Sequence, residues 1–215
     1  MDNKLKNICD FYAITHKLKT VLRTGWVVWG VKTLRFESVA EHIYGTQMLA
    51  FVINSEFELG LDIEKVILML AMHELGESII GDIPVVDIIA KKITKEEKHR
   101  LETEAVMEIL RPLNDKDRLE KLFDEFEEGH TPEAKFSRRI DKLEGCFQCK
   151  FHEETGCNDY TTPREGVFEK IRTERIAKGW TTMARAWIEN DKRVCDFDEL
   201  FKNIADYLID NKIFG

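Results

Sequence analysis

The amino-acid sequence predicts an all-α protein, and two observations carry this prediction. Apolar residues recur at helical spacing along nearly the whole chain, whereas the period-two alternation typical of half-buried strands is almost absent. Ser38 and Thr94 each precede a glutamate by three residues, which is the pattern of a capping box, and Thr131 is followed by a proline that favours the first helical position. We therefore expect a bundle of helices joined by short loops.

The expected helices can be placed in order along the chain. They cover residues 4–22, 38–57, a segment from Asp62 through VILMLAMHEL, 94–110, 115–127, a segment from Thr131 through FSRRIDKLEGCF, 164–177, 181–190 and 196–211. Residues 24–36 contain glycines and tryptophans without helical periodicity, so a loop or a short hairpin is expected there. Residues 81–84 predict a break after the helix that bears His73, and residues 156–163 predict a polar loop.

Length, charge and cysteine content limit the classes of protein. A chain of 215 residues fits a single domain over residues 1–215, with a core over about 16–150 and a C-terminal helical extension over about 151–215. The net charge of -8 argues against binding to nucleic acid, and no apolar run reaches the length of a membrane span. The N-terminus lacks the features of a secretory signal, and the five cysteines are odd in number, so we expect reduced thiols and a cytoplasmic location.

Two further segments are interpreted as structural. Cys146 and Cys149 lie three residues apart in an expected helix, without the strand–helix–strand context of a redox motif, so we interpret them as buried thiols on successive turns. The run KKITKEEKHRLETE, residues 91–104, alternates in charge at helical spacing and predicts a solvent-exposed face.

Four polar residues interrupt apolar helical segments. They are His42, the adjacent pair His73 and Glu74 within VILMLAMHEL, and Asp141 within FSRRIDKLEGCF. Burying an ionised carboxylate costs several kcal/mol unless it is paired or bound to a metal. Two imidazoles and two carboxylates form a mixed nitrogen and oxygen set that suits Zn, Mn, Co or Fe, and such an ion promotes hydrolysis by lowering the pKa of water that it binds. The sequence therefore predicts one divalent metal ion held by these four residues.

Two more carboxylates follow the histidine pair. Glu77 comes four residues after His73, which in a continuous helix places both side chains on one face. A carboxylate there is suited to general-base work on water. Asp82 lies just past the expected helix, where it is placed to accept hydrogen bonds from a substrate hydroxyl.

The segments ESVAEH ending at His42, HELGES starting at His73 with GDIP after it, and TPEAKFSRRIDKLE around Asp141 resemble the HD superfamily. Within it, they resemble the branch of 5'-deoxynucleotidases, from about His16 to about Glu144. The resemblance implies a helical bundle, one divalent metal ion (Mn, Co, Zn, Fe or Mg), hydrolysis of deoxynucleoside 5'-monophosphates to deoxynucleoside and phosphate, and a homodimer.

The resemblance also implies roles for individual residues. His42, His73 and Asp141 fall on metal-ligand positions, and Glu77 falls on the catalytic carboxylate. Asp82 falls on the residue that reads the sugar 3'-hydroxyl.

Two residues of the segment LRTGW, Arg23 and Trp26, resemble the family's phosphate-binding arginine and the tryptophan that lines its sugar pocket. Arg35 is the alternative for the phosphate contact, because the connection from Trp26 to His42 is longer than the family pattern.

The family takes its name from adjacent His and Asp, whereas this chain has His73 followed by Glu74. Glutamate keeps the charge but adds a methylene, which is enough to move a bound ion by on the order of 1 Å and alter the rate. Two alternatives therefore stay open. One is an HD-type hydrolase for another phosphoester, such as a cyclic nucleotide, an alarmone or a nucleoside triphosphate, and the other is a non-catalytic dimer that binds metal or nucleotide.

Overall fold

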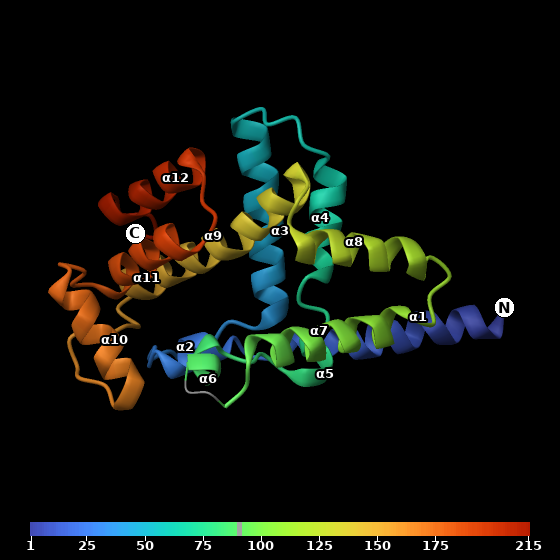
Figure 1. The fold of residues 1–215 in the computed structure, drawn as a ribbon, viewed down its shortest axis with the longest axis horizontal. Helices are drawn as coiled ribbons and strands as arrows, with labels where there is room; N and C mark the ends of the chain where they lie inside the picture. The colour runs from blue at the N-terminus through green and yellow to red at the C-terminus, as the bar shows by residue number, and fades with distance from the viewer. Residues whose placement is uncertain (90–91) are drawn as a thin grey trace. The chain divides into compact units, whose positions relative to one another are not determined.

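The protein is all-α in the computed structural model, which describes residues 1–89 and 92–215 (Figure 1). Within these residues no β-strand forms, and Leu22 and Ser38 make an isolated antiparallel bridge. None of the helices so described combines the length and apolarity that crossing a bilayer requires. The helices are α1 (Asp2–Thr15), the 3-10 helix η1 (His16–Lys19), α2 (Thr24–Val28), α3 (Val39–Glu56), α4 (Ile63–Met72), α5 (Glu77–Ile80), α6 (Val85–Ile89), α7 (Lys95–Leu110), α8 (Lys116–Glu128), α9 (Pro132–Glu154), α10 (Gly166–Ala177), α11 (Met183–Val194) and α12 (Glu199–Asp210).

The chain forms two compact units. Unit one comprises residues 1–25 and 36–138, and unit two comprises residues 26–35 and 139–215. The boundary between the two units therefore lies inside α9, between residues 138 and 139. The expected division into a core and a C-terminal extension near residue 150 stays a prediction.

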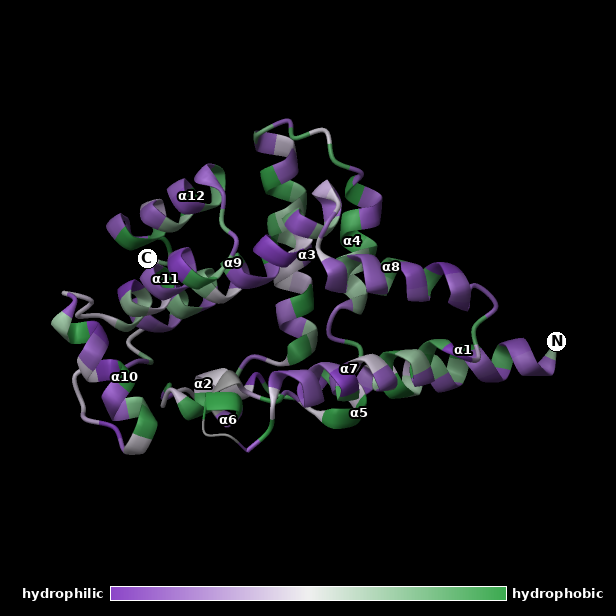
Figure 2. Ribbon diagram, in the orientation of Figure 1, coloured by the Kyte–Doolittle hydropathy of each residue, from purple (hydrophilic) through white to green (hydrophobic). Residues whose placement is uncertain are grey.

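The core of unit one is built from the apolar faces of η1, α3, α4, α7 and α8. Helix α8 illustrates the pattern, because it is largely hydrophilic with apolar residues at intervals (Figure 2). Its buried residues Leu122, Phe123 and Phe126 follow helical spacing and therefore form one stripe. Full burial of each such side chain contributes about 1.5–3 kcal/mol. The buried cluster consists of Leu18, Val39, Met69, Met72, Leu75, Val106, Ile109, Leu110, Leu122, Phe123, Phe126 and Ala134.

Unit two is held together by aromatic packing between its helices. The ring of Trp26 lies 4.8 Å from that of Trp187 in α11 and 5.1 Å from that of His152 in α9. Cys146 and Cys149 are free thiols, both fully buried on α9, and burial raises the pKa of each above its ordinary value. They are therefore inert packing groups, as expected.

The four helix starts predicted from capping residues are confirmed. The side chain of Ser38 accepts a hydrogen bond from the Glu41 amide at 3.3 Å, and the Glu41 carboxylate accepts one from the Ser38 amide at 2.9 Å. Asp62, Thr94 and Thr131 each accept a bond from the amide three residues later. Each cap depends only on residues within one turn, so the sequence alone specifies it.

Two predictions in the N-terminal third are wrong. Residues 24–36 are not a continuous loop or hairpin, because Thr24–Val28 forms α2, which buries Trp26. The N-terminal helix does not run to residue 22, since α1 ends at Thr15 and a 3-10 turn follows to Lys19.

The helix that was expected to continue past His73 also ends early. Helix α4 stops at Met72, His73 is its C-cap, and turns follow until α5 begins at Glu77. A Cβ atom on Gly76 would lie 2.9 Å from the carbonyl oxygen of Glu102 in α7, so this turn packs directly on the backbone of another helix. The break is therefore linked to a contact between segments far apart in the sequence.

Candidate metal centre

His42 lies near the N-terminus of α3, on its buried face. Val39, Thr46 and Ala50 share this face with it at helical spacing, and the imidazole is fully buried. The capping box begins four residues earlier, so the local sequence fixes the position of this histidine relative to the helix start.

His73 and Glu74 lie in the turn after α4. The Nδ1 atom of His73 is 2.8 Å from the carbonyl oxygen of Leu70. Because a carbonyl can only accept a hydrogen bond, Nδ1 carries the proton in neutral His73, which leaves Nε2 with the lone pair. Nε2 lies 3.6 Å from Oε1 of Glu74, and that same oxygen lies 3.4 Å from Nη1 of Arg23. The turn thus places the lone pair on Nε2 of His73 close to the carboxylate of Glu74.

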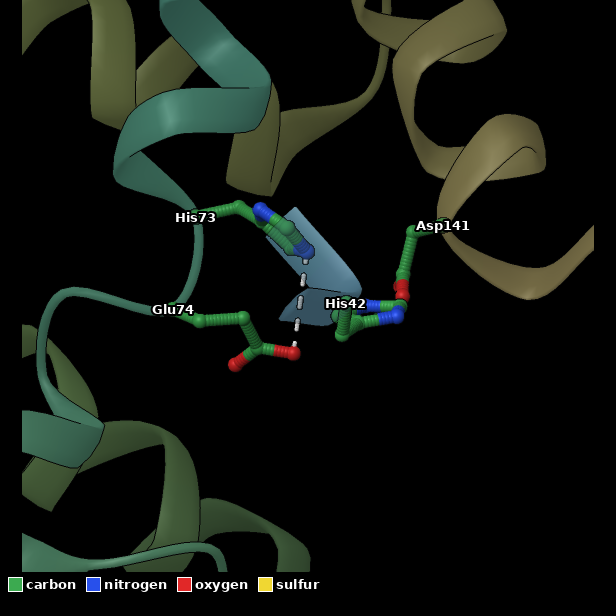
Figure 3. A group of neighbouring side chains, drawn as sticks. All are labelled: His42, His73, Glu74 and Asp141. Carbon is green, nitrogen blue, oxygen red and sulfur yellow. Dashed lines mark ion pairs between the residues drawn. The ribbon is translucent and has the colours of Figure 1, made fainter. Parts of the chain in front are cut away.

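Asp141 joins this group from α9, one helical turn after Arg138. Figure 3 shows its side chain with those of His42, His73 and Glu74, and one ligand atom from each of the four lies within 4.8 Å of the others. Nitrogen and carboxylate donors at this spacing fit a divalent first-row metal ion. The structure therefore brings together the four residues that the sequence singled out.

A second group overlaps the first at His42. Glu37, His42 and Glu144 are all buried and also offer ligand atoms within 4.8 Å of one another. Carboxylates beside a metal-binding histidine commonly orient its ring. Neither glutamate stands out in the sequence as a candidate, although Glu144 follows Asp141 by three residues on the same helix and therefore lies on nearly the same face.

Glu77 is buried at the start of α5, with 2% of its surface exposed. Its Oε2 atom has no hydrogen-bond partner among the residues that the structure describes. Burial, followed by the negative charges of Glu74 and Asp82, raises the pKa of Glu77 to about 10, and the positive charges of Arg23 and Lys98 oppose this rise. The carboxyl group therefore holds a proton at neutral pH unless a nearby cation stabilises its ionised form.

The expected reason for Glu77 being near His73 is wrong in detail. The two residues do not share a continuous helix face, because α4 has already ended. Glu77 is instead held near the group by the turn itself, because its amide donates a hydrogen bond to the carbonyl oxygen of Glu74 at 3.1 Å.

Asp82 follows α5 and contacts the start of α2. Its Oδ2 accepts hydrogen bonds from the Thr24 amide at 2.5 Å and from the Thr24 hydroxyl at 2.9 Å. The carboxylate thereby fixes the backbone next to Arg23, whose guanidinium contacts Glu74. Its expected contact with a sugar hydroxyl stays a prediction.

The other two expected substrate contacts lie in unit two. Arg35 is an exposed residue, and Trp26 is 2% exposed and packs on Trp187. Arg23 contacts the metal group directly, because its Nη1 lies 3.4 Å from Oε1 of Glu74. The roles of Arg35 and Trp26 in substrate binding stay predictions.

The chain matches the model of a protein family described as HD domain over residues 15–184. This match spans more than half of the chain and contains all four residues of the metal group. The chain therefore belongs to the HD-domain family, as its motifs indicated.

Two relatives of this chain are named as 5'-deoxynucleotidases. The chain is 34% identical over 188 residues to 5'-deoxynucleotidase hdd1 of Schizosaccharomyces pombe, covering 82% of this chain and 88% of that protein. It is also 34% identical over 151 residues to human 5'-deoxynucleotidase HDDC2, covering 69% of this chain and 70% of the relative.

A solved structure supports the fold. A predicted metal-dependent phosphohydrolase from Magnetospirillum magnetotacticum MS-1 matches with a TM-score of 0.66 and 22% identity, over 97% of this chain and 94% of that one. At this identity the likeness shows the shared helical fold alone.

Proposed function

We propose that this protein hydrolyses deoxynucleoside 5'-monophosphates to deoxynucleoside and phosphate, with the help of one divalent metal ion. Membership of the HD-domain family and the relatives named 5'-deoxynucleotidase support the reaction. The observation that carries the proposal is the convergence of two imidazoles and two carboxylates within 4.8 Å.

His42, His73, Glu74 and Asp141 would hold the metal, and the lone pair on Nε2 of His73 is oriented for this task by the bond from Nδ1 to Leu70. When bound, a divalent ion at such a site polarises phosphate oxygens and makes water a better nucleophile. Mn, Co, Zn, Fe and Mg all remain candidates for it.

Glu77 is the group we assign to proton transfer. Its buried Oε2 would accept a proton from the attacking water, and the pKa that burial raises makes this carboxylate a stronger base than an exposed one. Positive charge nearby is needed to keep it ionised before the reaction. Arg23 supplies part of that charge.

We also assign phosphate binding to Arg23, with Arg35 as the alternative. Nη1 of Arg23 lies 3.4 Å from Glu74, so a phosphate bound beside Glu74 would lie within reach of the guanidinium. Asp82 would hold the chain segment next to Arg23 through Thr24 and contribute to recognition of the deoxyribose.

A phosphate-release assay across deoxynucleoside 5'-monophosphates tests the proposal. We expect release by the metal-loaded protein and its loss with chelator or in Glu77→Gln. The matched control is Glu128→Gln, which changes an exposed glutamate at the end of α8 and should keep full activity. Equal release by Glu77→Gln and wild type would refute the role of Glu77.

The same assay separates the alternatives. Preferential turnover of a cyclic nucleotide, an alarmone or a nucleoside triphosphate would replace the substrate class. Binding of metal and nucleotide without product under every ion would indicate a non-catalytic role.

We further propose a homodimer. Tyr44, Met48, Phe51 and Val52 are exposed apolar residues at helical spacing on α3, and such a stripe is typical of an interface. Light scattering should report a dimer, and Phe51→Glu should yield the monomer. The cytoplasmic location stays a prediction.

A further inference from the structure

Lys98 in α7 is a cation that the reaction described above leaves unused. Its ammonium group donates a hydrogen bond to Glu102 one turn later, and the two side chains are only 22% and 25% exposed. By contrast, Arg100 on the same helix pairs with Glu97 while 51% exposed. Lys98 and Glu102 are therefore not part of the solvated face that the charge run predicts.

The backbone next to this pair touches the turn that carries His73 and Glu74. Gly76 approaches Glu102 so closely that a Cβ atom on the glycine would lie 2.9 Å from the Glu102 carbonyl oxygen and 3.3 Å from its Cα. Contacts between α5 and α7 extend this packing. Helix α7 thus packs beside the turn that carries His73 and Glu74, and Lys98 lies one helical turn before Glu102 on this helix.

The charge of Lys98 acts on the acidic side chains of the site. Burial lowers the pKa of Lys98, but Glu102, Glu74 and Glu77 more than offset this effect and raise the pKa above its ordinary value. The lysine therefore stays protonated at neutral pH. Lys98 and Arg23 both counter the negative charge around Glu77.

A phosphate dianion that approaches Glu74 and Glu77 meets carboxylate repulsion, which fixed cations in a partly buried site can overcome. A lysine paired with one carboxylate and partly shielded from water is suited to exchange that partner for a phosphate oxygen. We propose that Lys98 is a second phosphate-binding cation beside Arg23, and that Glu102 positions its ammonium group. This inference rests on the proposed function, because it assumes a phosphate-bearing substrate.

The test compares two ligands that differ only in the phosphate group. Calorimetry on manganese-loaded protein measures the affinity for thymidine and for a non-hydrolysable 5'-phosphonate analogue of thymidine 5'-monophosphate. We expect Lys98→Met to weaken binding of the phosphonate by about 10- to 100-fold, the range for one charge-assisted hydrogen bond, and to leave thymidine binding unchanged. Lys98→Arg should restore most of the phosphonate affinity.

The control is Lys95→Met, the same substitution at an exposed position on the same helix, which should bind both ligands like wild type. Lys98→Gln makes the same comparison if Lys98→Met does not fold. Equal weakening of both ligands, or phosphonate binding that matches Lys95→Met, would overturn the inference. So would a wild-type protein that does not bind the phosphonate.

Turnover is measured separately. A wild-type protein that binds the phosphonate through Lys98 but releases no phosphate from any deoxynucleoside 5'-monophosphate would contradict the proposed hydrolysis and still support the role of Lys98.

Discussion

Replacing Glu77 by glutamine should stabilise the metal-free protein, and the gain should grow with pH. The native state holds the proton of Glu77 with a pKa of about 10, whereas the ordinary value is 4.5. Between these values the unfolded chain releases the proton and the native state keeps it, so stability falls by about 1.4 kcal/mol for each pH unit. At pH 7 the accumulated loss is about 3 kcal/mol, and glutamine, which resembles the protonated form, avoids it.

Denaturant unfolding of chelator-treated protein at several pH values measures this effect. We expect wild type and Glu77→Gln to have similar free energies of unfolding near pH 4.5, with the variant increasingly more stable toward pH 8. Glu128→Gln, at an exposed position, should follow wild type throughout. A difference between Glu77→Gln and wild type that does not change with pH would refute the reasoning, because it would show that Glu77 does not titrate differently in the two states.

Three further substitutions probe the elements around the site. Ser38→Ala removes the cap of α3 and should lower the free energy of unfolding by about 1 kcal/mol in denaturant titration, with a parallel loss of metal affinity because His42 lies in the first turns of that helix. Gly76→Ala places a Cβ against the Glu102 carbonyl and should cost about 1–3 kcal/mol, whereas Gly145→Ala, whose Cβ would lie 3.7 Å from Trp187, should be neutral or stabilising; equal stability of the two variants would contradict this packing. Glu74→Asp withdraws the carboxylate from Arg23 and should reduce the phosphate-release rate at least about tenfold; an unchanged rate would show that the added methylene is irrelevant.

The sequence predicts those parts of the fold that are determined within one or two helical turns. Ser38 and Thr94 cap their helices through atoms three residues away, so pattern reasoning finds them. The end of α4 is different, because the approach of Gly76 to Glu102 joins segments that lie 26 residues apart along the chain. Helix α2 likewise buries Trp26 against Trp187, which no local pattern reveals.

The same distinction applies to the site. His42 and Asp141 were recognisable because a polar residue in an apolar helical segment needs a partner. Lys98 was not, because it lies in a run of alternating charges that is typical of a solvated face, and its low exposure of 22% is visible only in the folded structure.

The charges around Glu77 explain both why its carboxyl group is protonated in the metal-free protein and why its ionised form needs nearby cations. Glu74, Glu77 and Asp82 bring three carboxyl groups together, while Arg23 and Lys98 contribute two positive charges to the same field. Protonation of Glu77 reduces the remaining negative charge, and the raised pKa of Glu77 reflects this. A divalent cation at the adjacent donor group would relieve it instead, and Glu77 could then release its proton and become available as a base. In the proposed reaction, metal loading and the readiness of Glu77 to accept a proton from water would therefore be coupled through the same electrostatic balance.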